Sequence, residues 1–269
     1  MDPRPIPAAD TMTGFSLALR RFRAARRMSQ LELALECNVS ARHVSFLETG
    51  RAKPSREMVL QLARGLVLPL SAQNTLLSAA GFAPAFPASP LESDALGPLR
   101  DVLSEMIARH GANPAMLCDR HWSILDANAA ARRLLSVFHG DAGETNVIRM
   151  LTQNSLSAEL VENYPEVLAE MRGRLQLEAL EAGDDEVLRE LLADVERACA
   201  DYPVGAADVA RRPLVPIIFR TPAGRLSFLS TIAHFGTSED VTVRDLRLEL
   251  FFPADQQTRD AMAMFEAAD

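Results

Sequence analysis

The sequence predicts a multidomain chain, in which an all-α five-helix domain is followed by an α+β domain with a five-stranded antiparallel sheet and a helical insert. Residues 13–82 carry apolar side chains at helical spacing, interrupted by cap and turn residues. Residues 83–95 are rich in proline and form the predicted linker. Residues 96–258 contain two short strand-like runs, a long helical stretch and three further strand-like runs, the order expected for an antiparallel sheet packed against helices.

Each helix of the first domain has a boundary signal. The predicted N-caps are Thr13, Ser29, Ser40 and Ser55. Glu32 completes a capping box with Ser29, Asn38 forms the next turn, and Gly50 ends the third helix. On the core side we expect Leu31, Ala34 and Leu35 from the second helix, and Val44 and Leu47 from the third.

The second domain begins with an amphipathic helix near residue 99. Strand-like runs follow at residues 115–119 and 121–126, and a short helix is predicted at 128–138. Residues 144–200 read as helical, and the last three strands are predicted at 214–220, 225–235 and 243–252. The domain is expected to end near 258, with residues 1–12 disordered and residues 259–269 forming a C-terminal tail.

Charge is distributed unevenly along the chain. The net charge is −8, yet residues 1–90 carry 11 basic and 6 acidic side chains, whereas residues 91–269 carry 17 and 30. A basic head on an acidic body is typical of a small nucleic-acid-binding module joined to a part that does not bind nucleic acid.

Targeting and cofactor signals are absent from the sequence. The N-terminus lacks a signal-peptide core, and no uncharged apolar run approaches the roughly 18–20 residues that span a bilayer, so we expect a cytoplasmic protein without a membrane partner. Cys37, Cys118 and Cys199 show neither metal nor disulfide spacing, and Cys37 and Cys118 are expected to be buried thiols. We expect no metal site and no required cofactor.

The second and third predicted helices have the pattern of a DNA-binding helix-turn-helix, with an apolar inner face and a free outer face. Arg42 is the best candidate for a bidentate contact with guanine, and Ala41 is small enough to approach a thymine methyl group. Gln30 begins the second helix, where a phosphate can bind. The predicted DNA-binding residues are Gln30, Ser40, Ala41, Arg42, His43, Ser45, Phe46, Arg51, Lys53, Ser55 and Arg56. The expected partner is a double-stranded DNA operator.

Residues 13–80 resemble the lambda-repressor-like, xenobiotic-response-element (XRE) type of helix-turn-helix regulator. The likeness is carried by Leu19-Arg20, Arg26-Arg27, Met28-Ser29-Gln30, Leu33-Ala34, Val39-Ser40, Val44-Ser45, Leu47-Glu48, Gly50, Pro54-Ser55 and Leu62-Ala63. The resemblance implies that Gln30, Ala41, Arg42 and Ser45 lie at positions used at the DNA, and that Glu48 supports the helix.

The C-terminal part resembles the ligand-binding domain of MmyB-like regulators. The resemblance rests on residues 119–130, 146–151, 224–228, 235–237, 240–242 and 248–255, whereas residues 110–115 depart from the tighter, Pro-rich entry that is more common in that family. It implies a PAS-like fold that holds a small molecule between sheet and helices, and a fatty acid or another lipophilic effector suits a mostly apolar lining. The predicted lining residues are Trp122, Ile148, Leu151, Phe219, Phe228, Thr231 and Phe235.

Together these observations predict a homodimeric transcription regulator that binds DNA and senses a small apolar effector. One alternative is a DNA-binding regulator whose C-terminal domain serves only dimerisation or partner-protein binding, because strand alternation does not distinguish a filled core from a cavity. A second alternative, an enzyme fused to a DNA-binding domain, is disfavoured because the sequence shows no phosphate loop and no nucleophile–base pair. We therefore expect that the chain is not an enzyme.

Overall fold

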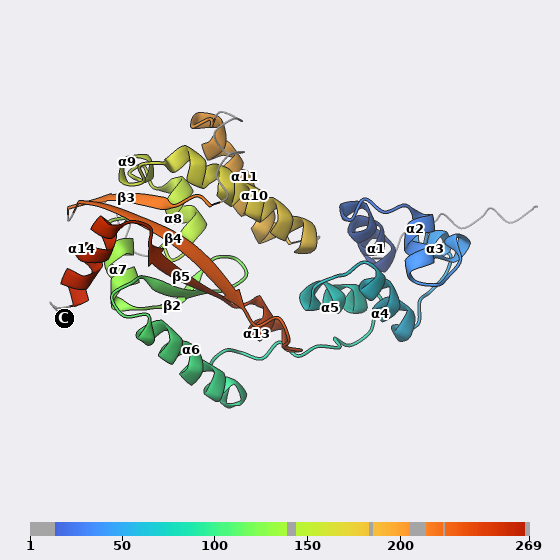
Figure 1. The fold of residues 1–269 in the computed structure, drawn as a ribbon. Helices are drawn as coiled ribbons and strands as arrows, with labels where there is room; N and C mark the ends of the chain where they lie inside the picture. The colour runs from blue at the N-terminus through green and yellow to red at the C-terminus, as the bar shows by residue number, and fades with distance from the viewer. Residues whose placement is uncertain (1–13, 139–143, 183–184, 205–213, 223, 267–269) are drawn as a thin grey trace, which may run out of the picture. The chain divides into compact units, whose positions relative to one another are not determined.

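The chain divides into two compact units, one of residues 1–87 with 178–185 and the other of residues 88–177 with 186–269, so the first boundary falls between Pro87 and Ala88, inside the predicted Pro-rich linker. The computed structural model describes residues 14–138, 144–182, 185–204, 214–222 and 224–266 (Figure 1). The predicted cap Thr13 and the predicted disordered segment 1–12 lie outside these residues. Within the described residues, no helix combines the length and apolar character needed to cross a membrane.

The first unit is all-helical, as predicted. Its helices are α1 (Gly14–Ala25), α2 (Gln30–Glu36), α3 (Ala41–Glu48), α4 (Arg56–Gly65) and α5 (Leu70–Ala79). Three predicted N-caps are confirmed, because the hydroxyls of Ser29, Ser40 and Ser55 each accept a hydrogen bond from a backbone N–H in the first turn. The turns contain Asn38 and Gly50 in the left-handed region, with φ of 48° and 75°.

The buried face of α2 differs from the prediction. Leu33, Ala34 and Cys37 face the core together with Val44 and Leu47 of α3. Leu31 and Leu35 were expected there, but they are 59% and 72% exposed. Apolar residues occur on two sides of this short helix, and only the packing of its neighbours selects the side with Leu33.

Residues of the predicted linker attach to the unit on their own side of the division. In the first unit, the side-chain oxygen of Asn74 accepts hydrogen bonds from the backbone N–H groups of Ala85 and Phe86, at 2.9 and 3.1 Å. In the second unit, the backbone N–H of Ser89 donates to Asp240 at 3.2 Å.

The second unit is built on one five-stranded antiparallel sheet in the order β2-β1-β5-β4-β3, which confirms the predicted α+β class. The strands are β1 (Ala115–Cys118), β2 (Ile124–Ala127), β3 (Ile217–Thr221), β4 (Gly224–His234) and β5 (Arg247–Pro253). The helical elements are η1 (Asp94–Leu96), α6 (Gly97–Arg109), α7 (Ala129–Ser136), α8 (Val147–Gln153), α9 (Ser157–Leu160), α10 (Tyr164–Ala182), α11 (Glu186–Asp201), α13 (Val241–Asp245) and α14 (Gln256–Glu266).

Two boundaries in this unit correct the prediction. Residues 243–245 were assigned to the last strand, but they belong to α13, because the carboxylate of Asp240 caps a helix there. The segment from 259 was expected to be a tail, but α14 continues to Glu266 and buries Thr258 and Met262. The hydroxyl of Thr258 accepts a hydrogen bond of 2.8 Å from the backbone N–H of Ser227, which attaches α14 to β4.

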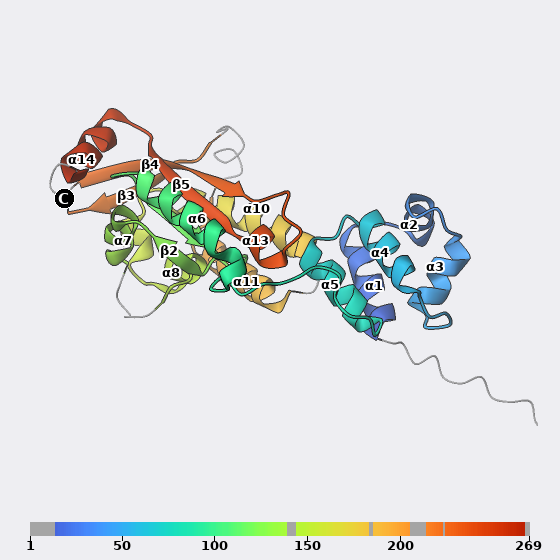
Figure 2. The same cartoon turned by 90° about the horizontal axis from the view of Figure 1, so that it is seen from below.

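Helices cover both faces of the sheet (Figures 1 and 2). On one face, Leu103 and Ile107 of α6 pack against Ala115, Leu117 and Leu248. Because side chains alternate along a strand, the neighbouring residues of β1 and β5 point to the opposite face, which α7, α8 and α10 cover.

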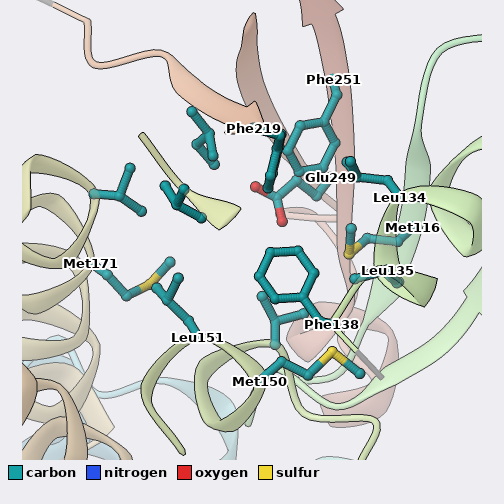
Figure 3. A pocket seen from close by; sticks show the side chains of 14 residues that line it. Met116, Leu134, Leu135, Phe138, Met150, Leu151, Met171, Phe219, Glu249 and Phe251 are labelled. Carbon is teal, nitrogen blue, oxygen red and sulfur yellow. The ribbon is translucent and has the colours of Figure 1, made fainter. Parts of the chain in front are cut away.

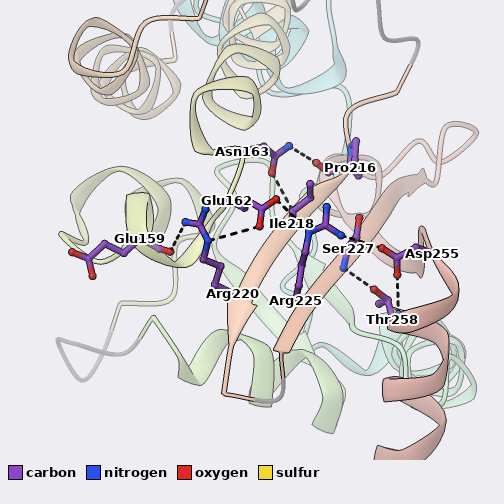
Figure 4. A network of polar contacts seen from close by, with 10 residues as sticks. All are labelled: Glu159, Glu162, Asn163, Pro216, Ile218, Arg220, Arg225, Ser227, Asp255 and Thr258. Carbon is purple, nitrogen blue, oxygen red and sulfur yellow. Dashed lines mark hydrogen bonds and ion pairs between the residues drawn. The ribbon is translucent and has the colours of Figure 1, made fainter.

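A polar network fastens the β3–β4 edge to its surroundings (Figure 4). Asn163, just before α10, donates to the carbonyl of Pro216 and accepts from the backbone N–H of Ile218. Arg225 pairs with Glu162 at 3.3 Å and with Asp255 at 3.2 Å. The helical insert and the start of α14 are therefore tied to the same two strands.

Candidate DNA interface and ligand cavity

The inner side of α3 is fixed by the core, which presents its first turns outward. Val44 and Leu47 are fully buried, whereas Arg42 is exposed. The guanidinium carbon of Arg42 lies 5.1 Å from the centre of the Phe46 ring, one turn later on the same face. The aromatic face orients the guanidinium without using the N–H donors that a guanine contact requires.

A buried ion pair supports the far end of α3. The carboxylate of Glu48 accepts hydrogen bonds from the guanidinium of Arg23 on α1, at 2.5 and 2.9 Å, and from the amide of Gln30 on α2, at 2.7 Å. The same guanidinium donates to the carbonyl of Met28 at 2.6 Å. The hydrogen bond to Glu48 raises the pKa of Arg23. This network joins three helices, and it engages the amide of Gln30 that was predicted to meet a phosphate.

Arg23 was not singled out in the sequence, where it lies among several arginines that read equally well as a solvated helix face. The available signal was Glu48, which follows Val44 by four residues and therefore lies on the same inward face of its helix. A carboxylate on a buried face requires a partner.

The other predicted DNA-binding residues gather around α3 and the start of α4. The hydroxyls of Ser40 and Ser55 are engaged in capping. The guanidinium of Arg56 donates to the carbonyl of Ala83 at 2.6 Å. Arg51 and Lys53 are exposed in the segment after α3. Ala41, His43, Ser45 and Phe46 are half-buried along α3.

A cavity of about 70 Å³ lies in the second unit, between the sheet and helices α7, α8 and α10 (Figure 3). Its lining is almost wholly apolar and includes three methionines. The residues that line it are Met116, Leu134, Leu135, Phe138, Val147, Met150, Leu151, Val161, Val167, Met171, Ile217, Phe219, Glu249 and Phe251.

Two of the seven predicted ligand residues, Leu151 and Phe219, line this cavity. Phe228 lies directly behind the wall, with its ring centre 6.3 Å from that of Phe219 and 6.2 Å from that of Phe251. Ile148 is fully buried in α8 without reaching the cavity lining.

Three predicted lining residues lie elsewhere. Thr231 stands opposite Leu250 in the β4–β5 register, and Phe235 and Leu250 both pack against the cluster on the α6 side of the sheet, so Thr231 and Phe235 belong to the other face. Trp122 sits in a turn at φ 66°, fully buried, with the guanidinium carbons of Arg174 and Arg247 at 5.4 and 5.1 Å from its ring. It is a stacking partner for two cations rather than a cavity wall.

Glu249 is a wall residue that was not predicted. It is buried in β5 between Leu248 and Leu250, and its carboxyl group receives a hydrogen bond from Ser230. Burial raises the pKa of Glu249, whereas the neighbouring charges of Arg174 and Arg247 act in the opposite direction. A carboxylate within an otherwise apolar strand was the signal in the sequence.

A second apolar hollow of about 300 Å³ lies beside β4, between α7 and α14. Leu134 lines both spaces, and Phe228 borders the second one. Leu134 is therefore a wall residue of both apolar spaces.

Comparison with known proteins matches the N-terminal and C-terminal parts of the chain to two different family models. The family model described as the MmyB-like transcription regulator ligand binding domain matches residues 99–264, and a helix-turn-helix family model matches residues 19–71. Uncharacterized HTH-type transcriptional regulators of Mycobacterium bovis and Mycobacterium tuberculosis are 29% identical over 220 residues, which cover 72% of this chain and 79% of each relative. These families are transcription regulators rather than enzymes.

Proposed function

The chain belongs to the MmyB-like transcription regulators, DNA-binding proteins with a ligand-binding domain, and we propose that a small apolar effector in the cavity controls its binding to an operator. The observation that carries this proposal is the cavity between sheet and helices, in which a single carboxyl group interrupts an apolar lining among the described residues. The five-stranded sheet with its helical insert supports the PAS-like description of this domain.

The chemistry of the wall favours a flexible aliphatic effector, and a compound with an acyl chain, such as a fatty acid, is our first candidate. The cavity of about 70 Å³ is smaller than the roughly 150 Å³ that holds a benzene ring. Met116, Met150 and Met171 provide unbranched side chains that can move to admit a chain. The hollow beyond Leu134 offers further apolar space.

We propose that the regulator acts as a homodimer. One helix-turn-helix unit makes few base contacts, and two-fold operators match two-fold proteins. For the effector to control operator binding, it must bind one arrangement of the dimer more tightly than another. Equal affinity for both arrangements would leave the equilibrium between them unchanged.

The test is native mass spectrometry of the full-length protein, followed by extraction of bound compounds and titration of a fluorescent operator duplex selected from a random library. A dimer with an added aliphatic mass, whose removal and return change operator affinity, would support the proposal. The matched control is the Leu135→Trp variant. Leu135 is a partly buried residue of the cavity wall, and the larger tryptophan side chain would fill the cavity.

The alternative, a C-terminal domain that serves only dimerisation or partner-protein binding, predicts a different result. The Leu135→Trp variant would then bind the operator like the unaltered protein, and no aliphatic compound would change operator affinity in either protein.

A further inference from the structure

Glu249 places one carboxyl group in the apolar wall of the cavity. The strand β5 directs its side chain to the cavity face, beside Phe251 and opposite Phe138, and Figure 3 shows both carboxyl oxygens pointing into the space between the rings. The described lining contains no other charged or hydrogen-bonding side chain. Among the side chains of this described lining, the carboxyl of Glu249 is therefore the hydrogen-bonding group that a polar group of a bound molecule can meet.

The surroundings of Glu249 determine which polar group fits. Ser230 donates one hydrogen bond to the carboxyl, whose oxygens can accept at least one more in either protonation state. The positive charges of Arg174 and Arg247 act on it, and the negative charge of Glu170, which pairs with Arg174 at 3.4 Å one turn earlier on α10, acts in the opposite direction. Both arginines also stack on Trp122, so they are held in place beside the carboxyl.

Two kinds of polar group are disfavoured at this point. An ionised carboxylate only accepts hydrogen bonds, and it would bring its charge into an apolar cavity where burial already disfavours the charged form of Glu249. An ammonium group would add a third cation next to Arg174 and Arg247. A neutral O–H group avoids both conflicts and uses the free acceptor positions of the carboxyl.

We propose that the effector is a neutral, largely apolar molecule with a hydroxyl-type hydrogen-bond donor, which binds the carboxyl group of Glu249. This inference rests on the proposed effector cavity and narrows its ligand class. A fatty acid satisfies it in the protonated form, in which the acid O–H is the donor, but not as the anion.

The experiment uses the full-length protein and three six-carbon probes at pH 8: 1-hexanol, its isomer methyl pentyl ether, which lacks a donor, and hexanoate, which is ionised. Calorimetric titration measures each dissociation constant. We expect 1-hexanol to bind at least roughly tenfold more tightly than the ether or hexanoate, because only the alcohol satisfies the carboxyl.

Two variants locate the effect. Glu249→Gln keeps the shape of the side chain and adds an N–H donor, so hexanoate should gain affinity and the preference for 1-hexanol should fall to roughly threefold or less. Leu135→Trp should weaken binding of all three probes, because it fills the space without altering Glu249. The comparison of probes on the unaltered protein remains decisive even if Glu249→Gln fails to fold.

Equal or tighter binding of hexanoate or the ether to the unaltered protein, lost in Leu135→Trp, would overturn the hydroxyl inference while leaving the effector cavity intact. Failure of all three probes to bind would overturn the cavity as an effector site, and with it the inference. An unchanged preference in folded Glu249→Gln would show that Glu249 is not the recognising group.

Discussion

The guanidinium of Arg23 donates two hydrogen bonds, 2.5 and 2.9 Å long, to the carboxylate of Glu48, and so joins the first and third helices of the DNA-binding unit. Glu48 is only 2% exposed, so the pair is screened little by solvent on the carboxylate side. Glu48 is the last residue of α3, the helix that carries Arg42. Its contact with Arg23 therefore fixes the orientation of α3 relative to α1.

Loss of one partner of this pair should destabilise the helical unit. Glu48→Leu leaves the arginine charge without its carboxylate, and we expect a loss of about 3 kcal/mol in the free energy of unfolding, measured with urea. The double variant Arg23→Met, Glu48→Leu should recover part of this free energy of unfolding, since no charge is then left without a partner. A single-variant loss below about 1 kcal/mol would show that the pair contributes little.

Arg42 is expected to read one base pair. Arg42→Ala should relax specificity at a single position of the selected operator, at a cost of roughly 1–3 kcal/mol, measured with duplexes substituted at each position. Arg64→Ala, at an exposed position of α4 outside the predicted interface, is the control. If Arg42→Ala weakens all duplexes equally, the residue does not read sequence.

Arg51 and Lys53 are expected to act on phosphates instead. Arg51→Ala and Lys53→Ala should each weaken binding to every duplex by a similar factor and reduce the slope of log affinity against log salt by about 1. Titrations between low and moderate salt give that slope directly. A slope equal to that of the unaltered protein would place the residue away from the DNA backbone.

The buried carboxyl of Glu249 should make stability depend on pH. Burial raises the pKa of Glu249 above its ordinary value near 4.5, so the folded state holds this proton more tightly than the unfolded chain. The resulting stability is complete below about pH 4.5 and is lost as pH rises through the folded pKa. Urea unfolding from pH 4.5 to 8 should therefore show Glu249→Gln gaining stability relative to the unaltered protein as pH rises. Glu190→Gln, on the exposed side of α11, should show no such gain.

The C-terminal helix should contribute to the stability of the sheet. Met262 of α14 is 6% exposed and Met264 is 75% exposed, two residues apart on the same helix. Met262→Ala should cost about 2 kcal/mol because it opens a void beside β4, whereas Met264→Ala should be nearly neutral. Equal effects of the two substitutions, measured by chemical unfolding, would indicate that α14 does not pack as a helix in solution.

Local chemistry in the sequence determined much of this protein. The caps at Ser29, Ser40 and Ser55 and the turns at Asn38 and Gly50 depend on short-range hydrogen bonds and on backbone φ, which neighbouring residues specify by themselves. The α+β class followed in the same way from the alternation of strand-like and helical runs.

Tertiary structure decided which of two possible faces each element buries. Leu31 and Leu35 are as apolar as Leu33, and Thr231 lies beside Ser230 in the same strand, so only neighbouring elements select the core side. The partners of buried charges could not be predicted from the sequence either. Arg23 and Glu48 are 25 residues apart, and Arg174 comes near Glu249 only when α10 covers the sheet. Burial and ion pairing depend on segments distant in the chain, which local sequence patterns do not encode.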